Sequence, residues 1–450
     1  MRGLRSTIAL LVVLIGLGAY IYFVTWKQPS ASETASKQDR VFDKVEADKI
    51  DELKIKSDKG DVTTVRKEGG SWQVTSPMTT KADEAEVSGI TSGLSSLSVT
   101  RVVDENPTNL KDYGLAEPRV EIDFKTAGDK DYRKLFIGEK SPTGGDMFAR
   151  RNDDKKVFLV PAFQDSTFNK GTFDLREKSV LKVDRDKVDG IEVTSGGKTL
   201  AIAKDAGDWK VTKPVQAKAD FGSVEGLIGR LQSAQMKSIA APDASPADLK
   251  KYGLDKPEVT VNLNTGSSRA TLLVGNKAED NTVYVRDASK PMVMTVESSL
   301  VDELKKGPDE YRRKDIFEFR PFNANRIELT RDGQTVAFEK VKGQGENPQD
   351  KWRRVSPTAG DVDKDKFEGW LSRLANMRAA SFVDSSAKTG LDKPALTVYA
   401  KFDDGKKEER VTFGKAGDDV YAARPGEPGA AKADTSDFNE VTKTLDELSK

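Results

Sequence analysis

Pairs of adjacent aspartates are the residues of this chain whose type and spacing come nearest to a catalytic arrangement. They stand at positions 153–154, 403–404 and 418–419. A glycoside hydrolase needs two carboxyl groups held at a fixed separation across a cleft, whereas neighbouring residues of a strand point to opposite faces. The pairs also lie in turn-like stretches with lysines, such as NDDKK and FDDGKK. We therefore expect solvated turns here and predict no catalytic residue.

Alternating aspartates at Asp361, Asp363 and Asp365 resemble the start of a calcium-binding loop. Such a loop needs glycine at its sixth position and glutamate at its twelfth, but these positions hold Lys366 and Ser372. Asp363 has a simpler explanation, because it precedes an amphipathic pattern and can cap the N-terminus of a helix. The sequence predicts no metal site.

Two short motifs, FIGEK at 136–140 and LVGNK at 273–277, contain the Gly-x-Lys of a phosphate-binding loop. A true P-loop has the form Gly-x-x-x-x-Gly-Lys-Ser/Thr and opens a helix. Here the spacing differs and an extended run follows, so we interpret both motifs as turns that end strands. No cofactor is predicted, and no ligand-binding residue can be assigned.

Composition excludes several classes of activity. The 450 residues include no cysteine and no histidine, which removes disulfides, thiolate nucleophiles, zinc–cysteine sites and histidine bases. The 73 basic and 73 acidic residues balance and are interspersed, so no field attracts nucleic acid. Carboxylates, lysine, tyrosine and serine–lysine pairs remain for chemistry, and we predict that the protein is not an enzyme.

The N-terminus carries the clearest local signal. No residue from Ser6 to Trp26 is charged, and as a helix this segment would span roughly 30 Å, the hydrocarbon thickness of a bilayer. A cleaved signal peptide would have a shorter apolar core followed by small residues. We expect an uncleaved anchor at 6–26, a cytoplasmic N-terminus at 1–5 and a flexible polar stalk at 27–42. Arg2 and Arg5 predict that the N-terminus stays inside.

The remaining sequence repeats itself three times. Taken from Trp72, Trp209 and Trp352, a proline follows after five residues, an aspartate after eleven and apolar residues after fifteen, eighteen and twenty-two. A Gly-Leu-x-x-Pro motif comes next, and its glycines, Gly114, Gly253 and Gly390, stand 139 and 137 residues apart. Self-similarity at a fixed period is the signature of a repeat protein. We predict repeat domains at 43–178, 179–315 and 316–450.

Each repeat has the pattern of an α+β domain. Alternating apolar runs such as GIEVTS and KTLAIAKD predict antiparallel strands joined by tight turns. The Asp of each copy precedes apolar residues at helical spacing, which predicts one main amphipathic helix. Gly-Leu-x-x-Pro reads as the turn from helix to sheet, and a short closing helix follows at 299–306 and 438–450. We expect about seven strands in a mainly antiparallel sheet per repeat, following an N-terminal transmembrane helix.

The segments between repeats are also alike: LREKSV at 175–180 matches YRRKDI at 311–316. They lack the proline, glycine and serine of flexible linkers. This favours an elongated array of packed neighbours, and a moderately flexible junction stays open as the alternative.

With these motifs assembled, the chain resembles a bacterial membrane-anchored family called domain of unknown function 4340, in three tandem copies. The resemblance rests on Trp-x-Val-x-x-Pro, Tyr-Gly-Leu-x-x-Pro and hydrophobic-Gly-x-Lys. In the first two copies the matching residues are Trp72, Pro77, Tyr113, Gly114, Leu115, Pro118, Gly138, Lys140, Trp209, Pro214, Tyr252, Gly253, Leu254, Pro257, Gly275 and Lys277. The third copy departs, with Thr389 in place of tyrosine and Arg354 in place of valine.

The resemblance implies a single-pass protein of the inner membrane whose bulk is periplasmic or otherwise extracytoplasmic, linked with ABC-type exporters of the gliding-motility-like kind. It carries no catalytic residues over to this chain. We expect a non-enzymatic scaffold whose partners are transporter subunits or other envelope proteins, with the membrane as anchor and no nucleic acid. Two alternatives stay open: a solute- or polymer-binding receptor with a cleft between repeats, and a carboxylate-dependent hydrolase.

Overall fold

The computed structural model describes residues 39–343 and 350–449, which divide into two compact units, one up to Lys178 and the other from Ser179. The predicted anchor at 6–26 and most of the predicted stalk lie outside the described residues. Among the residues that are described, no helix combines the length and the apolar character needed to cross a membrane.

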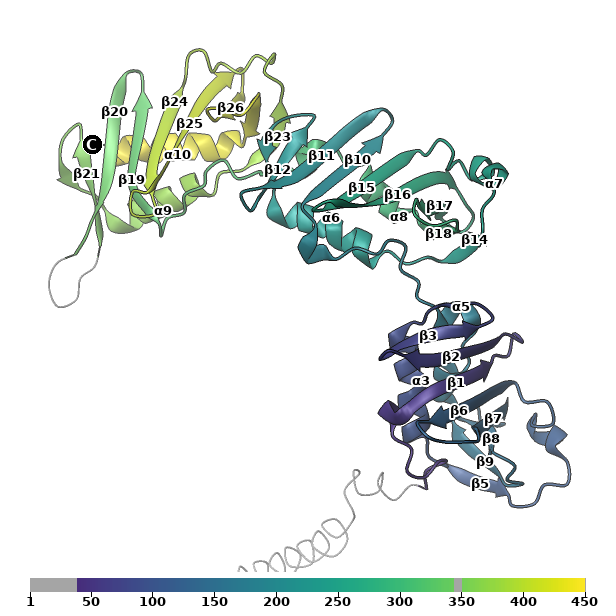
Figure 1. The fold of residues 1–450 in the computed structure, drawn as a ribbon. Helices are drawn as coiled ribbons and strands as arrows, with labels where there is room; N and C mark the ends of the chain where they lie inside the picture. Colours follow the sequence, from purple (N-terminus) through teal and green to yellow (C-terminus); the bar gives the residue numbers. More distant parts are fainter. Residues whose placement is uncertain (1–38, 344–349, 450) are drawn as a thin grey trace, which may run out of the picture. The chain divides into compact units, whose positions relative to one another are not determined.

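The first unit is one repeat, built on a nine-stranded antiparallel sheet (Figure 1). The strand order is β4-β3-β2-β1-β6-β7-β8-β9-β5, so each terminal strand is a short one. Its elements are η2 (Ala47–Lys49), β1 (Ile50–Lys56), β2 (Val62–Glu68), β3 (Ser71–Ser76), β4 (Thr80–Lys81), α3 (Glu84–Ser96), β5 (Arg101–Asp104), η3 (Leu110–Tyr113), β6 (Val120–Thr126), β7 (Arg133–Lys140), β8 (Asp146–Arg151), β9 (Val157–Pro161), η4 (Ala162–Gln164), α4 (Asp165–Phe168) and α5 (Thr172–Leu175).

The second unit holds two further copies with the same strand order. The second repeat contains η5 (Arg185–Lys187), β10 (Gly190–Ser195), β11 (Lys198–Asp205), β12 (Asp208–Lys213), β13 (Ala217–Lys218), α6 (Phe221–Ser233), β14 (Ser238–Ala241), α7 (Pro246–Lys251), β15 (Val259–Thr265), β16 (Ser268–Lys277), β17 (Thr282–Asp287), β18 (Val293–Glu297), α8 (Ser299–Leu304) and η6 (Pro308–Glu310). The third contains β19 (Ala324–Arg331), β20 (Gln334–Val341), β21 (Lys351–Ser356), β22 (Gly360–Asp361), α9 (Lys364–Ala375), β23 (Ala379–Val383), β24 (Leu396–Phe402), β25 (Lys407–Ala416), β26 (Asp419–Ala423), β27 (Ala430–Ala433) and α10 (Thr435–Leu448).

The fold confirms a threefold α+β architecture and corrects its details. Each sheet has nine strands instead of about seven, because β4 and β5 and their counterparts are too short to show an alternating pattern. The stalk was predicted to run to residue 42, but Val41 and Phe42 are buried in the first core. The last helix was predicted from 438; it begins at Thr435, since the Asp434 carboxylate caps it by accepting from the Asp437 N–H.

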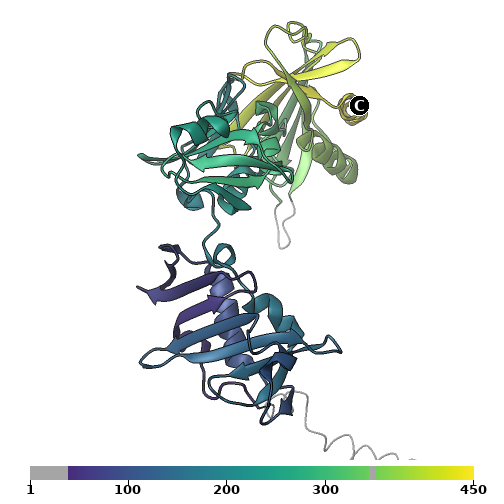
Figure 2. The ribbon, with the colours of Figure 1, turned by 90° about the vertical axis from the view of Figure 1, so that its right-hand side faces the viewer.

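One face of each sheet carries the core, and the main helix lies across it; Figure 2 shows α3 along the first sheet. Strand alternation explains this, because inward residues of β6 such as Val120, Ile122 and Phe124 are fully buried while the residues between them are not. The predicted helix caps are confirmed. Asp83, Asp220 and Asp363 each accept hydrogen bonds from backbone N–H groups of the first helical turn.

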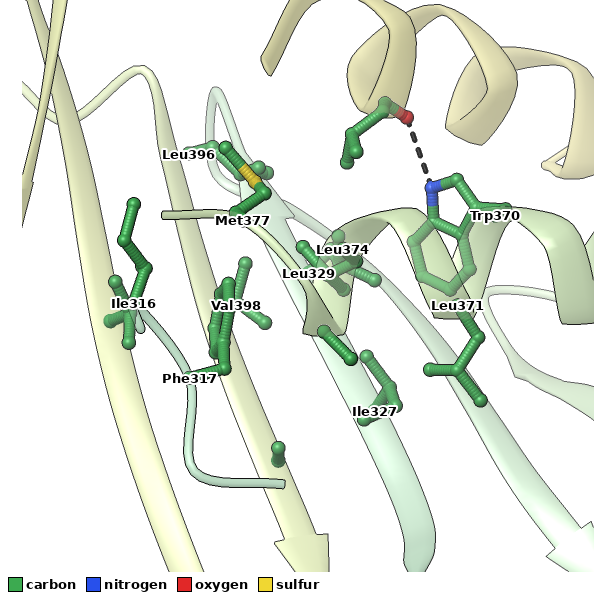
Figure 3. Packing of buried hydrophobic residues seen from close by; sticks show 14 of the residues in the cluster. Ile316, Phe317, Ile327, Leu329, Trp370, Leu371, Leu374, Met377, Leu396 and Val398 are labelled. Atoms are coloured by element: carbon green, nitrogen blue, oxygen red, sulfur yellow. Dashed lines mark hydrogen bonds between the residues drawn. The ribbon is translucent and has the colours of Figure 1, made fainter. Parts of the chain in front are cut away.

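The third core shows how the repeated tryptophan is used. Trp72 and Trp209 are buried, while Trp352 is only half-buried at the margin of its core. Trp370 of α9 lies deeper, and its Nε1 donates to the Val441 carbonyl of α10 at 3.0 Å (Figure 3). This bond fixes the two helices of the third repeat against each other while satisfying a buried donor.

Candidate interaction site at the repeat junctions

The Gly-Leu-x-x-Pro turn packs its backbone against the strand that carries Gly-x-Lys. Gly114, Gly253 and Gly390 have φ values of +65°, +72° and +67°, the left-handed region that favours glycine. On the facing strand, a Cβ added at Gly275 would stand 2.2 Å from the Tyr252 carbonyl oxygen, and one at Gly138 would stand 2.1 Å from that of Tyr113. The turn glycine is therefore favoured by its backbone conformation, and the strand glycine is required by its close contact with the backbone of the turn.

The motif tyrosine belongs to a second, smaller core. In the second repeat Tyr252 and Leu254 pack with Ala241 and Val293, and the Tyr252 hydroxyl donates to the Ala240 carbonyl at 3.3 Å. Partly buried Leu273 joins this cluster while its neighbour Leu272 faces the main core, so the cluster covers the opposite face of the sheet. Strand β18 is consequently buried on both sides.

This arrangement changes the interpretation of the motif. Both motif tyrosines are engaged within their own repeat: Tyr252 is buried, and the half-buried Tyr113 hydroxyl donates to Asp104 at 3.2 Å. The turn was predicted to connect the main helix to the sheet; instead β5 or β14 intervenes, and Gly114 ends the short helix η3. Sequence reasoning missed η3 and α7 because neither is long enough to show a period, although Ser245 and Asp248 form a capping box at α7.

Strand addition characterises the end of each of the first two repeats. The residue after β4, Ala82, pairs with Arg176, and the Asp83 N–H donates to the Leu175 carbonyl at 2.9 Å. The Glu177 N–H returns a bond to the Lys81 carbonyl at 2.8 Å. The matching segments LREK and YRRK, called here the seam segments, therefore pair with the sheet edge through an isolated β-bridge and its flanking backbone hydrogen bonds.

The second repeat reproduces these contacts. Ala219 pairs with Arg312, the Asp220 N–H donates to the Tyr311 carbonyl at 2.8 Å, and the Arg313 N–H donates to the Lys218 carbonyl at 2.9 Å. The chain then enters the next repeat at once, where Asp315 pairs with Arg378. The seam segment thus completes one sheet and leads directly into the following domain.

Arg176 and Arg312, the arginines of the two seam segments that pair with the sheet edges, are both buried. The sequence did not predict this burial. Arg176 is 7% and Arg312 is 6% exposed, and burial lowers the pKa of each guanidinium. The Arg312 guanidinium carbon stands 3.7 Å from the centroid of the Phe382 ring in the third repeat, a geometry that favours a cation–π interaction. An arginine at the same position of both seam segments was the one feature of the sequence that could have indicated this shared role.

An acidic side chain reinforces the seam between the second and third repeats. Glu318, just before β19, pairs with Lys218 of β13 and with Arg313 at 3.0 Å. Burial alone would raise the pKa of Glu318, but the Lys218 hydrogen bond and the Arg313 charge lower it to about 2. Glu318 is therefore ionised throughout the physiological range and ties the two repeats together.

Most of the aspartates predicted to lie in solvated turns do so, but Asp419 is the first residue of β26. Asp403 and Asp404 adopt positive φ values of a turn, and hydrogen bonds from Lys407 and Lys432 lower the pKa of Asp403 and Asp419. A general acid would need the opposite shift. Gly138 and Gly275 lie within β7 and β16 instead of ending them. Within residues 39–343 and 350–449 no group of three acidic side chains is placed to hold a metal ion.

The cavity at the seam of the second and third repeats is smaller than one beside the edge of the third repeat. The cavity between the seam segment and the third repeat, beside Arg312, Phe382 and Arg424, has a volume of about 30 Å³, room for about one water molecule. A larger cavity of about 390 Å³ lies beside β22, and it is lined by Asp350, Lys351, Trp352, Asp361, Val362, Lys364, Phe367 and Glu368.

Comparisons with known proteins give a family but no activity. No curated protein matches the chain. A solved structure, the DNA polymerase sliding clamp from Pseudomonas aeruginosa with ligand, aligns over 89% of this chain and 93% of its own at 7% identity, with a TM-score of 0.18 that is too low to indicate a shared fold. The profile of the family described as Domain of unknown function (DUF4340) matches residues 72–210, 209–394 and 352–450. These matches begin at the three repeated tryptophans, and the chain belongs to this family.

Proposed function

We propose that the protein is a non-enzymatic scaffold of the cell envelope, anchored by residues 6–26, which presents its repeats to a membrane complex. The main support for this proposal is that the residues that recur between repeats have structural roles. The paired glycines, the capping aspartates and the seam arginines all serve folding or the joining of repeats. Repeats that share only structural positions are typical of repeat proteins, which stack their units to form an extended surface for binding partners.

The cavities support the scaffold over a receptor with a cleft between repeats. Such a receptor would place a concave site of several hundred Å³ at a repeat junction. The cavity at the junction of the second and third repeats has about 30 Å³ and is lined by arginines engaged in the seam. The Arg424 guanidinium, for example, donates to the carbonyls of Asp315 and Ile316.

Subunits of an ABC-type exporter are the partners that we propose to test first. Each repeat carries one strongly exposed phenylalanine: Phe163, Phe221 and Phe322 are 72%, 67% and 80% exposed. Single exposed apolar residues need no partner to explain them, which makes them harmless positions for a photo-cross-linking amino acid. The three variants would be irradiated in native membranes and their adducts identified by mass spectrometry, with the buried Phe317 position as a control.

The expected result is one or more integral membrane proteins, transporter subunits among them, cross-linked from at least one exposed position and absent from the control. Recovery of no membrane protein from any of the three positions would contradict the scaffold proposal.

A further inference from the structure

The third repeat presents the edge that pairs with a seam segment in the first two repeats. Val362 is the counterpart of Ala82 and Ala219, one residue beyond the terminal strand β22. In the described part of the chain, β22 pairs with β21 alone. Over the same residues, neither Val362 nor Asp363 donates its N–H to a backbone carbonyl. Unpaired edges of this kind are templates for adding an extended peptide.

The charges on this edge indicate what it accepts. In the second repeat Lys218 pairs with the acidic Glu318 of the following repeat. Asp361 stands at the position of Lys218, which inverts the sign of the charge offered to an incoming segment. Asp361 is 88% exposed, and its ion-pair partner is Arg353, a neighbour within the same sheet, at 3.0 Å. A basic segment therefore suits this edge better than an acidic one.

Asp363 is a second acidic group on this edge, and it stands where a lysine of an added strand could reach it. In the first repeat the seam lysine Lys178 reaches the capping carboxylate of Asp83 at 2.9 Å. Asp363, the equivalent cap, is exposed and bonds to the Lys366 N–H. A lysine two residues beyond the pairing position of an added strand would reach the Asp363 carboxylate in the same way.

Beside the edge lies the 390 Å³ cavity, with Trp352, Val362 and Phe367 as its apolar lining and charged residues at its rim. The rim carries both signs, so it does not itself select a charge. The cavity is large enough for one bulky side chain. It explains why Trp352 is half-buried where Trp72 and Trp209 are buried.

We propose that the edge formed by Gly360–Asp363, together with this cavity, binds an extended basic segment of a partner protein as an added antiparallel strand. The segment would resemble the seams: a bulky apolar residue, an arginine opposite Val362 and a lysine near Asp363. The seam segments of a second copy are already paired within their own repeats, which favours a different protein. This inference rests on the proposed scaffold function and names the chemistry of its partner.

The test uses the full-length chain and a fluorescein-labelled peptide that carries the basic seam sequence YRRK, residues 311–314, between neutral flanking residues. Fluorescence anisotropy would measure its binding. The control peptide carries glutamate in place of both arginines. We expect saturable binding of the first peptide and at least ten-fold weaker binding of the second. Asp361→Lys should also weaken binding of the first peptide by at least ten-fold.

A matched pair of variants isolates the backbone donor. Asp363 has φ −60°, which proline can adopt. Asp363→Pro and Asp363→Ala both lose the helix cap, but only the proline variant loses the N–H that an added strand needs. We expect measurable binding to Asp363→Ala and none to Asp363→Pro, with circular dichroism confirming that both variants are folded.

Equal binding to the two variants, equal binding of the two peptides, or no binding to the wild-type chain would each overturn the inference. So would dimerisation through this edge, seen in sedimentation velocity as a dimer that Asp361→Lys abolishes. Failure of peptide binding alongside recovery of a membrane partner by photo-cross-linking would reject this inference and leave the scaffold proposal intact.

Discussion

At the scale of single residues, the paired glycines show best how a repeated motif can serve structure. Gly253 supplies a positive φ and Gly275 supplies the absence of a side chain, and the two residues meet across one backbone contact. From the sequence, the turn and its glycine could be predicted because Gly and Pro restrict the chain in known ways. The role of Gly275 could not, since its partner lies on another element and emerges only in the fold.

Replacement of Gly275 by alanine tests this contact. The added Cβ would overlap the Tyr252 carbonyl oxygen, which is backbone and cannot move away cheaply. We expect a loss of about 3 kcal/mol or more in the free energy of unfolding of the second unit, measured by urea denaturation. Gly226→Ala is the matched control: it lies in α6 with no neighbour within 4 Å of the new Cβ, so it should stabilise by up to about 1 kcal/mol. Similar effects of the two changes would refute the contact.

At the scale of elements, helices were easier to predict than the sheet edges. Capping aspartates and apolar spacing located α3, α6 and α9, because both signals are local. The two-residue strands β4, β13 and β22 and the pairing of the seam segments depend on backbone bonds to distant residues, so no periodicity marks them. The candidate site lies among these edges, and for that reason the sequence indicated the seam segments only through their mutual resemblance.

The ion pairs at Glu318 make a prediction for the seam between the second and third repeats. The folded-state pKa of about 2 lies below the ordinary 4.5, so Glu318 contributes stability above pH 4.5 and loses it as the pH falls towards 2. Because the side chain is part-exposed, we expect Glu318→Gln to cost about 1 to 2 kcal/mol at pH 7. The difference from wild type should shrink between pH 4.5 and 2. Urea denaturation across this range measures it.

The exposed Glu440 of α10 serves as the control for that series, since Glu440→Gln should leave stability nearly unchanged at pH 7. A Glu318→Gln difference that stays constant from pH 7 to pH 3 would show that its ion pairs do not stabilise the seam.

At the scale of the whole molecule, the first two repeats each pair with the chain segment that leads into the next repeat. One seam segment pairs with the edge of the first repeat and the other with the edge of the second, while the matching edge of the third has no such partner among the described residues. The same edge that pairs with a seam segment in the first two repeats is therefore the edge that we propose binds a partner in the third. It also explains why residues shared by all three copies reveal the architecture, whereas the proposed docking site lies where the third copy departs from the other two.

Hydrogen exchange at three equivalent amides of the purified full-length chain tests this claim most directly. The Asp83 and Asp220 amides donate to seam carbonyls, and the Asp363 amide lacks a backbone acceptor in the described part of the chain. We predict that Asp363 exchanges at least about 100-fold faster than Asp83 and Asp220, because exchange of a paired edge amide requires local opening. Protection of Asp363 equal to that of Asp220 would contradict the account.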